Sequence, residues 1–161
     1  MKSIIIFQEQ NYLFALDFRQ FETHFILDEM WITPSKKSKE LWNYQNNKKN
    51  ITGQFIHFGH LLGFCPAIFN YDGAIFLKTY DDGCQYGLYI NNFIAQIPIN
   101  KISSKYSELD AGTRLPEQVS PKLFSQVFKF KRRTVLLINP VQIYKKYLLN
   151  EMHPEASFLS K

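Results

Sequence analysis

The chain has 161 residues, a net charge of +5 and a hydrophobic share of 45% that includes 15 Phe and 9 Tyr. This composition excludes a disordered chain, and its aromatic richness favours half-buried pleated sheets over a helical bundle. The positive charge is too small and too scattered to indicate a nucleic-acid-binding protein by itself. Two cysteines, Cys65 and Cys84, are too few for a disulfide framework.

The first predicted element is a hairpin of two strands, residues 3–7 and 12–17, joined by a polar turn. The apolar run at the N-terminus, Ile4 to Phe7, is shorter than the apolar core of about 7–15 residues that a signal peptide needs. No apolar run reaches the length of about 20 residues that a membrane-spanning helix needs, so we expect a cytoplasmic protein. A short helical turn over 19–22 and an extended stretch over 24–32 follow.

The middle of the chain contains the clearest hairpin. Residues 35–50 are polar and rich in Asn and Lys, which predicts a long connection before a strand over 53–58. Residues 74–80 and 85–90 then form two strands around Asp82-Gly83, a preferred pair for a tight hairpin turn.

The rest of the chain predicts a bend, a second hairpin and a helix. After Asn91-Asn92 the apolar positions shift by one residue, which indicates a bulge or bend of the kind that a small closed barrel needs. The second hairpin joins 123–130 to 134–138, and the latter strand is apolar on both faces and therefore central. A short helix then begins, with Asn139 as its cap and Pro140 at its first position.

Five segments, in this order, resemble the CheW-like family over residues 3–149. They are IIIFQEQNYLFALDF, RQFETHFIL, GQFIHFGHLLGF, YGLYINNFIAQI and FSQVFKFKRRTVLLINPVQIYKKYLL. The resemblance implies an all-β fold, in which two small five-stranded β-barrels pack together and a short C-terminal helix follows. The chain would be a single domain over 1–161, made of two barrel subdomains, with a frayed tail over 151–161.

The same resemblance implies a function in chemotaxis or twitching motility. Members of the family are non-enzymatic scaffolds in two-component signal transduction. They couple a methyl-accepting chemoreceptor or pilus sensor to the regulatory domain of a CheA-like histidine kinase, without a cofactor or metal and without direct membrane insertion. The kinase binds the hydrophobic end of one barrel, and the receptor's helical tip binds in the groove between barrels.

Matching the segments to the family gives a set of partner-binding residues. Phe21 and His24 fall where the family places groove-lining residues, and Gly87, Ile90 and Phe93 fall on the bent strand. The full predicted set is Phe21, His24, Phe25, Gly53, Gly87, Ile90 and Phe93. For Phe21 and Phe25 the alternative is burial in a core, which is the usual place for Phe.

Two departures from the family's pattern indicate a specialised member. Family members commonly carry Leu-Arg-Gly where this chain has Ile51-Thr52-Gly53, and Asp-Leu where it has His57-Phe58. The sequence leaves open whether Thr52 and His57 retain the contacts to the kinase or the receptor, and whether the pathway is flagellar or pilus-based.

Two kinds of site chemistry can be imagined and are not expected. His57, His60 and Cys65 are candidate zinc ligands, but a fourth ligand is missing and His24 would have to come from elsewhere in the fold. Cys65 or Cys84 paired with a histidine would need an orienting third group to become a nucleophile. We therefore expect no metal site and no enzyme.

The alternative hypothesis is a basic β-barrel protein that binds nucleic acid. Lys129, Lys131, Arg132 and Arg133 alternate with Phe128 and Phe130 near one hairpin tip. Bases stack on aromatic rings while cations follow the phosphates, so such a stripe is a candidate for single-strand binding. However, a strand places alternate residues on opposite faces, which would separate the rings from the cations and favours a solvated hairpin tip.

Overall fold

The structure is a computed structural model that describes residues 3–26, 31–36, 40–48, 50–70, 72–79, 85–102, 106–117 and 119–149. Strands dominate this part of the chain, and short helical segments connect them. The strands are β1 (Ser3–Glu9), β2 (Tyr12–Asp17), β3 (Thr23–Ile26), β4 (Trp31–Pro34), β5 (Trp42–Asn46), β6 (Ile51–His57), β7 (Ala74–Thr79), β8 (Gln85–Ile90), β9 (Phe93–Pro98), β10 (Phe124–Phe130) and β11 (Arg133–Ile138). The helical segments are 3-10 turns at Phe18–Gln20, Ile99–Lys101 and Pro121–Leu123, α1 (Phe58–Leu61), α2 (Pro140–Ile143) and a π-helical turn at Tyr144–Leu149.

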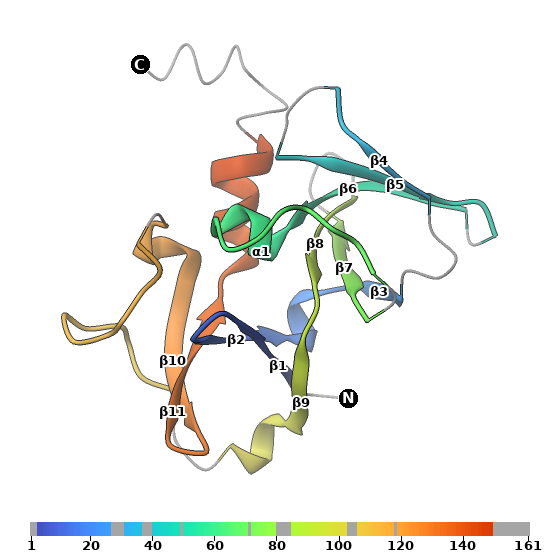
Figure 1. Cartoon of the computed structure of the whole chain (residues 1–161). Coiled ribbons are helices and arrows are strands. Elements are labelled where there is room, and N and C mark those ends of the chain that lie inside the picture. The colour runs from blue at the N-terminus through green and yellow to red at the C-terminus, as the bar shows by residue number, and fades with distance from the viewer. Residues whose placement is uncertain are drawn as a thin grey trace.

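The strands form two sheets that lie against each other (Figure 1). Sheet A has the order β10-β11-β2-β1-β9, and sheet B has the order β3-β7-β8-β6-β5-β4. This confirms the all-β class and the paired architecture. The expected closed five-stranded barrels need a correction: sheet B has six strands, and within the described ranges no pairing joins the first and last strand of either sheet.

Alternation along the strands produces three hydrophobic cores. In β1, Ile5 and Phe7 face the core between the sheets, whereas Ile4 and Ile6 face a second core on the far side of sheet A. The strands β2 and β11 divide their side chains in the same way, so they are buried on both faces. A third core lies on the far side of sheet B around Tyr89. Helix α1 adds Phe58, the residue after it adds Leu62, and helix α2 adds Ile143 to the core between the sheets.

The chain leaves sheet B and enters sheet A between β8 and β9. Asn92 has a left-handed φ of 57°, and its carbonyl accepts a hydrogen bond from Gln8 N at 3.1 Å. The pairing of β9 with β1 contains a register shift, since Ile6 pairs with Ala95 but Phe7 pairs with Phe93. The predicted bulge or bend at Asn91-Asn92 is therefore confirmed, and both features occur.

Several predicted elements need correction or lie outside the described residues. The stretch 35–50 contains β5, which pairs with β4 and β6, so it is not simply a long connection. Asn139 precedes α2 as predicted, but its side chain makes no capping hydrogen bond. The Asp82-Gly83 tip, Cys84 and the tail over 151–161 lie outside the described residues.

Candidate functional site

An apolar groove lies where the edge of sheet A meets sheet B. Its volume is about 390 Å³, and β9 and β7 form its two sides. The residues that line it are Ile5, Phe18, Asp72, Gly73, Ala74, Phe76, Phe93, Ile94, Ala95 and Gln96. Ile5, Ala74 and Phe76 belong to the core between the sheets, so the floor of the groove is the outer margin of that core.

The two most exposed apolar side chains of the groove come from the start of β9. Phe93 is 42% exposed and Ile94 is 48% exposed. Ile94 is the extra residue at the register shift against β1, and a β-bulge re-aims the side chains beside it. Because of this bulge, two consecutive apolar residues both line the groove, although consecutive residues of a regular strand face opposite sides.

Aromatic rings stack along the side of the groove that follows β2. The ring centroids of Phe18 and Phe76 are 5.8 Å apart, and those of Phe21 and Phe76 are 5.7 Å apart in an edge-to-face arrangement. Asp17 fixes the 3-10 turn that carries Phe18, because its carboxylate accepts a hydrogen bond from Arg19 N at 2.9 Å and pairs with Arg19 Nη2 at 2.6 Å. The aromatic side of the groove is thus held by a capped turn.

The other end of the groove is polar and is formed by the turn before β7. Asp72 N donates to Asn70 Oδ1 at 3.1 Å, and Gly73 N donates to Asn70 O at 3.1 Å. A Cβ at Gly73 would overlap the ring of Tyr89, whose hydroxyl accepts from Asn70 N at 3.2 Å. The glycine is therefore required by close packing, and the exposed Asp72 places a carboxylate beside an apolar surface.

The comparison with solved structures decides which fold this is. The crystal structure of the scaffolding protein TtCheW from Thermoanaerobacter tengcongensis matches with a TM-score of 0.60 over 86% of this chain and 88% of that chain, at 17% sequence identity. The chain has a CheW-like fold. No protein-family model and no curated protein matches the sequence.

In this CheW-like fold some of the predicted partner-binding residues lie at the groove and others are enclosed by the protein. Phe93 lines the groove directly, and Phe21 contacts the groove through Phe76. Ile90 is 1% exposed, so a partner cannot reach its side chain. Gly87 is enclosed as well, because a Cβ there would overlap the carbonyl oxygen of Phe76 and stand 2.6 Å from Leu77 Cδ2.

The remaining predicted residues lie on β3 and β6 of the CheW-like fold. Along β3, the backbone of His24 pairs with Phe76 and that of Phe25 pairs with Ile75, while their side chains are outside the described part of the structure. Gly53 lies on β6, where a Cβ would stand 2.5 Å from the ring and hydroxyl of Tyr44. Gly53 thus makes room for an aromatic ring of the neighbouring strand.

Of the ten residues that line the groove, the predicted set contains Phe93 alone; Phe18, Asp72 and Ile94 are among those that it misses. The apolar pair Phe93-Ile94 was the available signal for Ile94, because two consecutive apolar residues break the alternation of an otherwise regular strand. Phe18 and Asp72 become part of the groove only through the way the two sheets pack, which no local pattern specifies.

His57 and His60 have structural partners. His57 Nδ1 accepts a hydrogen bond from His60 N at 3.1 Å, and His57 Nε2 lies 3.0 Å from Ile68 O. Burial lowers the pKa of His57, which favours the neutral ring. In the described residues no three His, Cys, Asp or Glu side chains are grouped to hold a metal ion. No helix there is long and apolar enough to cross a membrane.

Proposed function

We propose that the protein is a non-enzymatic adaptor that couples a methyl-accepting chemoreceptor, or a pilus sensor, to a CheA-like histidine kinase in the cytoplasm. The observation that carries the proposal is the exposed apolar groove between the two sheets of a CheW-like fold. Adjacent apolar side chains exposed at a groove are typical of a partner site, and Phe93 and Ile94 are adjacent here. The similarity to a scaffolding protein supports the same function.

The receptor is the proposed occupant of the groove. A helical tip lays apolar side chains spaced by three or four residues into a groove and is anchored by a few of them. Phe93 and Ile94 supply the exposed apolar contact, and the half-buried Phe18, which packs against the buried Phe76, supplies a rigid wall. A volume of about 390 Å³ suits a few side chains of a helix rather than a whole domain.

The remaining predicted residues would act beside the groove or through the shape of sheet B. His24 and Phe25 lie on β3, which is an outermost strand of sheet B in the described residues, and a second partner would bind along this strand. Gly53, Gly87 and Ile90 would act indirectly, since they allow the close strand packing that places β8 and β9.

The experiment that tests the proposal is a reconstitution with both partners. The kinase regulatory domain and a soluble receptor tip from the same organism are mixed with the protein, singly and together, and complexes are separated by size-exclusion chromatography. We expect each partner to bind and a ternary complex to form, with affinities as weak as about tens of micromolar, typical of transient signalling contacts. If neither partner binds at concentrations well above this range, the adaptor function is wrong.

A further inference from the structure

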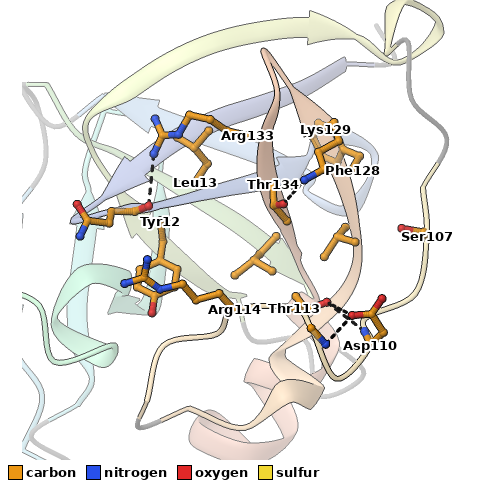
Figure 2. A pocket seen from close by; sticks show the side chains of 14 residues that line it. Tyr12, Leu13, Ser107, Asp110, Thr113, Arg114, Phe128, Lys129, Arg133 and Thr134 are labelled. Atoms are coloured by element: carbon orange, nitrogen blue, oxygen red, sulfur yellow. Dashed lines mark hydrogen bonds between the residues drawn. The ribbon is translucent and has the colours of Figure 1, made fainter.

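A second cavity lies at the opposite edge of sheet A from the groove. It has a volume of about 640 Å³ and is formed by the hairpin β10–β11, the start of β2 and the loop 106–117 (Figure 2). The residues that line it are Asn11, Tyr12, Leu13, Ser107, Asp110, Gly112, Thr113, Arg114, Val127, Phe128, Lys129, Arg133, Thr134 and Leu136. None of them lines the groove at β9.

The loop that closes this cleft is fixed at several points. Ser107 and Val127 exchange two backbone hydrogen bonds of 2.9 and 2.8 Å, and the Tyr12 hydroxyl donates to Leu115 O at 3.1 Å. Between these points Asp110 Oδ1 accepts from Gly112 N at 2.8 Å and from the Thr113 hydroxyl at 3.2 Å. A cleft that exists before binding requires little ordering of the protein when a ligand arrives.

Three cationic side chains surround the cleft (Figure 2). Arg114 lies 5.4 Å from the centroid of the Tyr12 ring, and Arg133 Nη2 donates to Asn11 O at 3.3 Å. Lys129 Nζ donates to the Thr134 hydroxyl at 2.7 Å. In the described part of the chain neither arginine has a carboxylate within ion-pair distance. These contacts orient the guanidinium groups without neutralising them.

The charge of the cleft is therefore positive, and its floor is apolar. Among the described residues that line it, the one acidic side chain is Asp110, whose carboxylate already accepts hydrogen bonds from its own turn. The apolar part of the floor is the half-buried Val127, which lies beside the buried Leu136. The side chains of Leu13 and Phe128 pack on the other face of sheet A. A ligand that suits both features carries negative charge around an apolar group.

The aromatic rings at this cleft argue against a nucleic acid as the ligand. Single-strand binding needs exposed rings on which bases stack. The Tyr12 ring is stacked against Phe64 at 5.7 Å, with an interplanar angle of 12°, and Arg114 lies over it as well. Phe128 is buried in the core beyond sheet A. Neither of these two rings is free to stack on a base, whereas an aliphatic or aromatic side chain can still contact the half-buried Val127.

We propose that this cleft is a docking site for an acidic linear segment of a partner protein, with one or two apolar residues between its carboxylates. The carboxylates pair with Arg114, Arg133 and Lys129, and the apolar residues contact the half-buried Val127. This inference goes beyond the adaptor function, because the cleft shares no residue with the groove. The cleft lies at β10 and the groove at β9, the two outermost strands of sheet A, so both sites can be occupied at once.

The experiment uses the full chain and fluorescently labelled hexapeptides. The probe Glu-Asp-Leu-Phe-Asp-Glu carries both features, Gln-Asn-Leu-Phe-Asn-Gln lacks the charges, and Glu-Asp-Gly-Ser-Asp-Glu lacks the apolar pair. We expect fluorescence anisotropy to detect binding of the first probe below about 1 mM, and at least about fivefold weaker binding of the other two. Binding should weaken as salt rises from about 50 to about 300 mM, because the charges are exposed.

Variants locate the binding and separate charge from shape. Arg114→Glu and Arg133→Glu are each expected to weaken binding of the first probe at least about fivefold. Lys145→Glu, an exposed lysine outside the cleft, is the matched control with the same change in charge and should not alter binding. Ser107→Trp should block the cleft without changing its charge, and a thermal melt verifies that each variant is folded.

Three outcomes overturn the inference. The first is no binding of the acidic probe to the wild-type chain at about 1 mM peptide. The second is equal weakening by Lys145→Glu, which would indicate attraction to overall charge alone. The third is binding of oligo-dT that is stronger than binding of the peptide and equally sensitive to Arg114→Glu, which would assign the cleft to nucleic acid. The adaptor function does not depend on any of these results, because the cleft shares no lining residue with the groove. For the same reason, Phe93→Ala should leave peptide binding unchanged.

Discussion

Phe93 is the register partner of Phe7 across the β1–β9 pair, yet Phe7 is fully buried whereas 42% of Phe93 is exposed. Residues that face each other across a ladder normally share one environment. The difference arises because β1 has a neighbour on each side, while β9 is an edge strand that begins where the chain crosses between sheets. The exposed groove is therefore a direct result of the crossing at Asn92.

Replacing Phe93 separates binding from stability. Phe93→Ala should change the free energy of unfolding by no more than about 1 kcal/mol, because much of the ring is already in water. We expect binding of the receptor tip to weaken about tenfold or more, as for an interface anchor. Calorimetric titration measures the binding, and urea denaturation measures the stability.

The matched control for this variant is Ile68→Ala. Ile68 is 62% exposed, more than Phe93, and it does not line the groove. Loss of binding in both variants alike would show that exposed apolar area in general, rather than this groove, contacts the receptor.

Gly87 is expected to be irreplaceable for packing. Gly87→Ala should destabilise the protein by about 3 kcal/mol, because the new methyl group overlaps a backbone carbonyl that cannot rotate away. Gly112→Ala is the control, since a Cβ there meets only Asp110 Oδ1 at 3.4 Å, and we expect a change within about 0.5 kcal/mol. Equal stability of the two variants in urea denaturation would contradict the enclosed position of Gly87.

Glu9 should make stability depend on pH. It is buried against α1, where a Cβ on Gly59 would stand 3.0 Å from Glu9 Oε1, and burial raises the pKa of Glu9 from 4.5 to about 7. Between these values the folded state holds a proton that the unfolded state releases. The free energy of unfolding therefore falls as pH rises from about 4.5 to about 7, by at most about 3 kcal/mol.

Glu9→Gln removes this ionisation while keeping the size of the side chain. We expect the free energy of unfolding of the variant to fall much less between about pH 4.5 and about pH 7, and the variant to be more stable than the wild-type chain above pH 7. Urea denaturation at several pH values measures both. Glu117→Gln, which changes an exposed carboxyl, should follow the wild-type profile. If the stability of the wild-type chain does not fall between pH 5 and pH 7, the prediction is wrong. If it falls equally in Glu9→Gln, a group other than Glu9 is responsible.

Thr52 marks a position where the family resemblance can be tested. It is exposed on β6, paired with Gln45 of β5, in the place where the family commonly carries arginine. If the kinase contacts this surface, Thr52→Arg should strengthen binding of its regulatory domain by about fivefold and leave receptor binding unchanged. Thr52→Lys, with the same charge but without the planar group, should gain less. No gain with either residue would indicate that this chain binds its kinase elsewhere.

Apolar runs and period-two alternation together predict most strands of the sheets but not β5. The apolar residues on both faces of β11 predict a buried central strand, and β1 and β2 are buried on both faces in the same way. β5 reads Trp-Asn-Tyr-Gln-Asn, and Asn is disfavoured in strands. It forms because β4 and β6 pair with it on both sides and because the Tyr44 ring fits over Gly53, and these contacts are set by the tertiary structure.

The site is predictable only in part for a related reason. The break in alternation after Asn92 identifies the region of Phe93, but the sequence does not distinguish the exposed Phe93 from the buried Ile90 three residues earlier. A glycine required by packing, such as Gly87, looks in sequence like a glycine at a partner surface. The difference lies in the neighbouring strand, whose position depends on the whole sheet.

The strand order also bears on how the protein is made. Sheet B is built from one continuous stretch, residues 23–90, whereas sheet A needs β1 and β2 from one end of the chain and β11 from near the other, with β2 and β11 running parallel. During synthesis the first hairpin leaves the ribosome long before its partner strand exists. We expect the nascent hairpin, apolar on both faces and with an unpaired edge, to depend on chaperones until the last strands emerge.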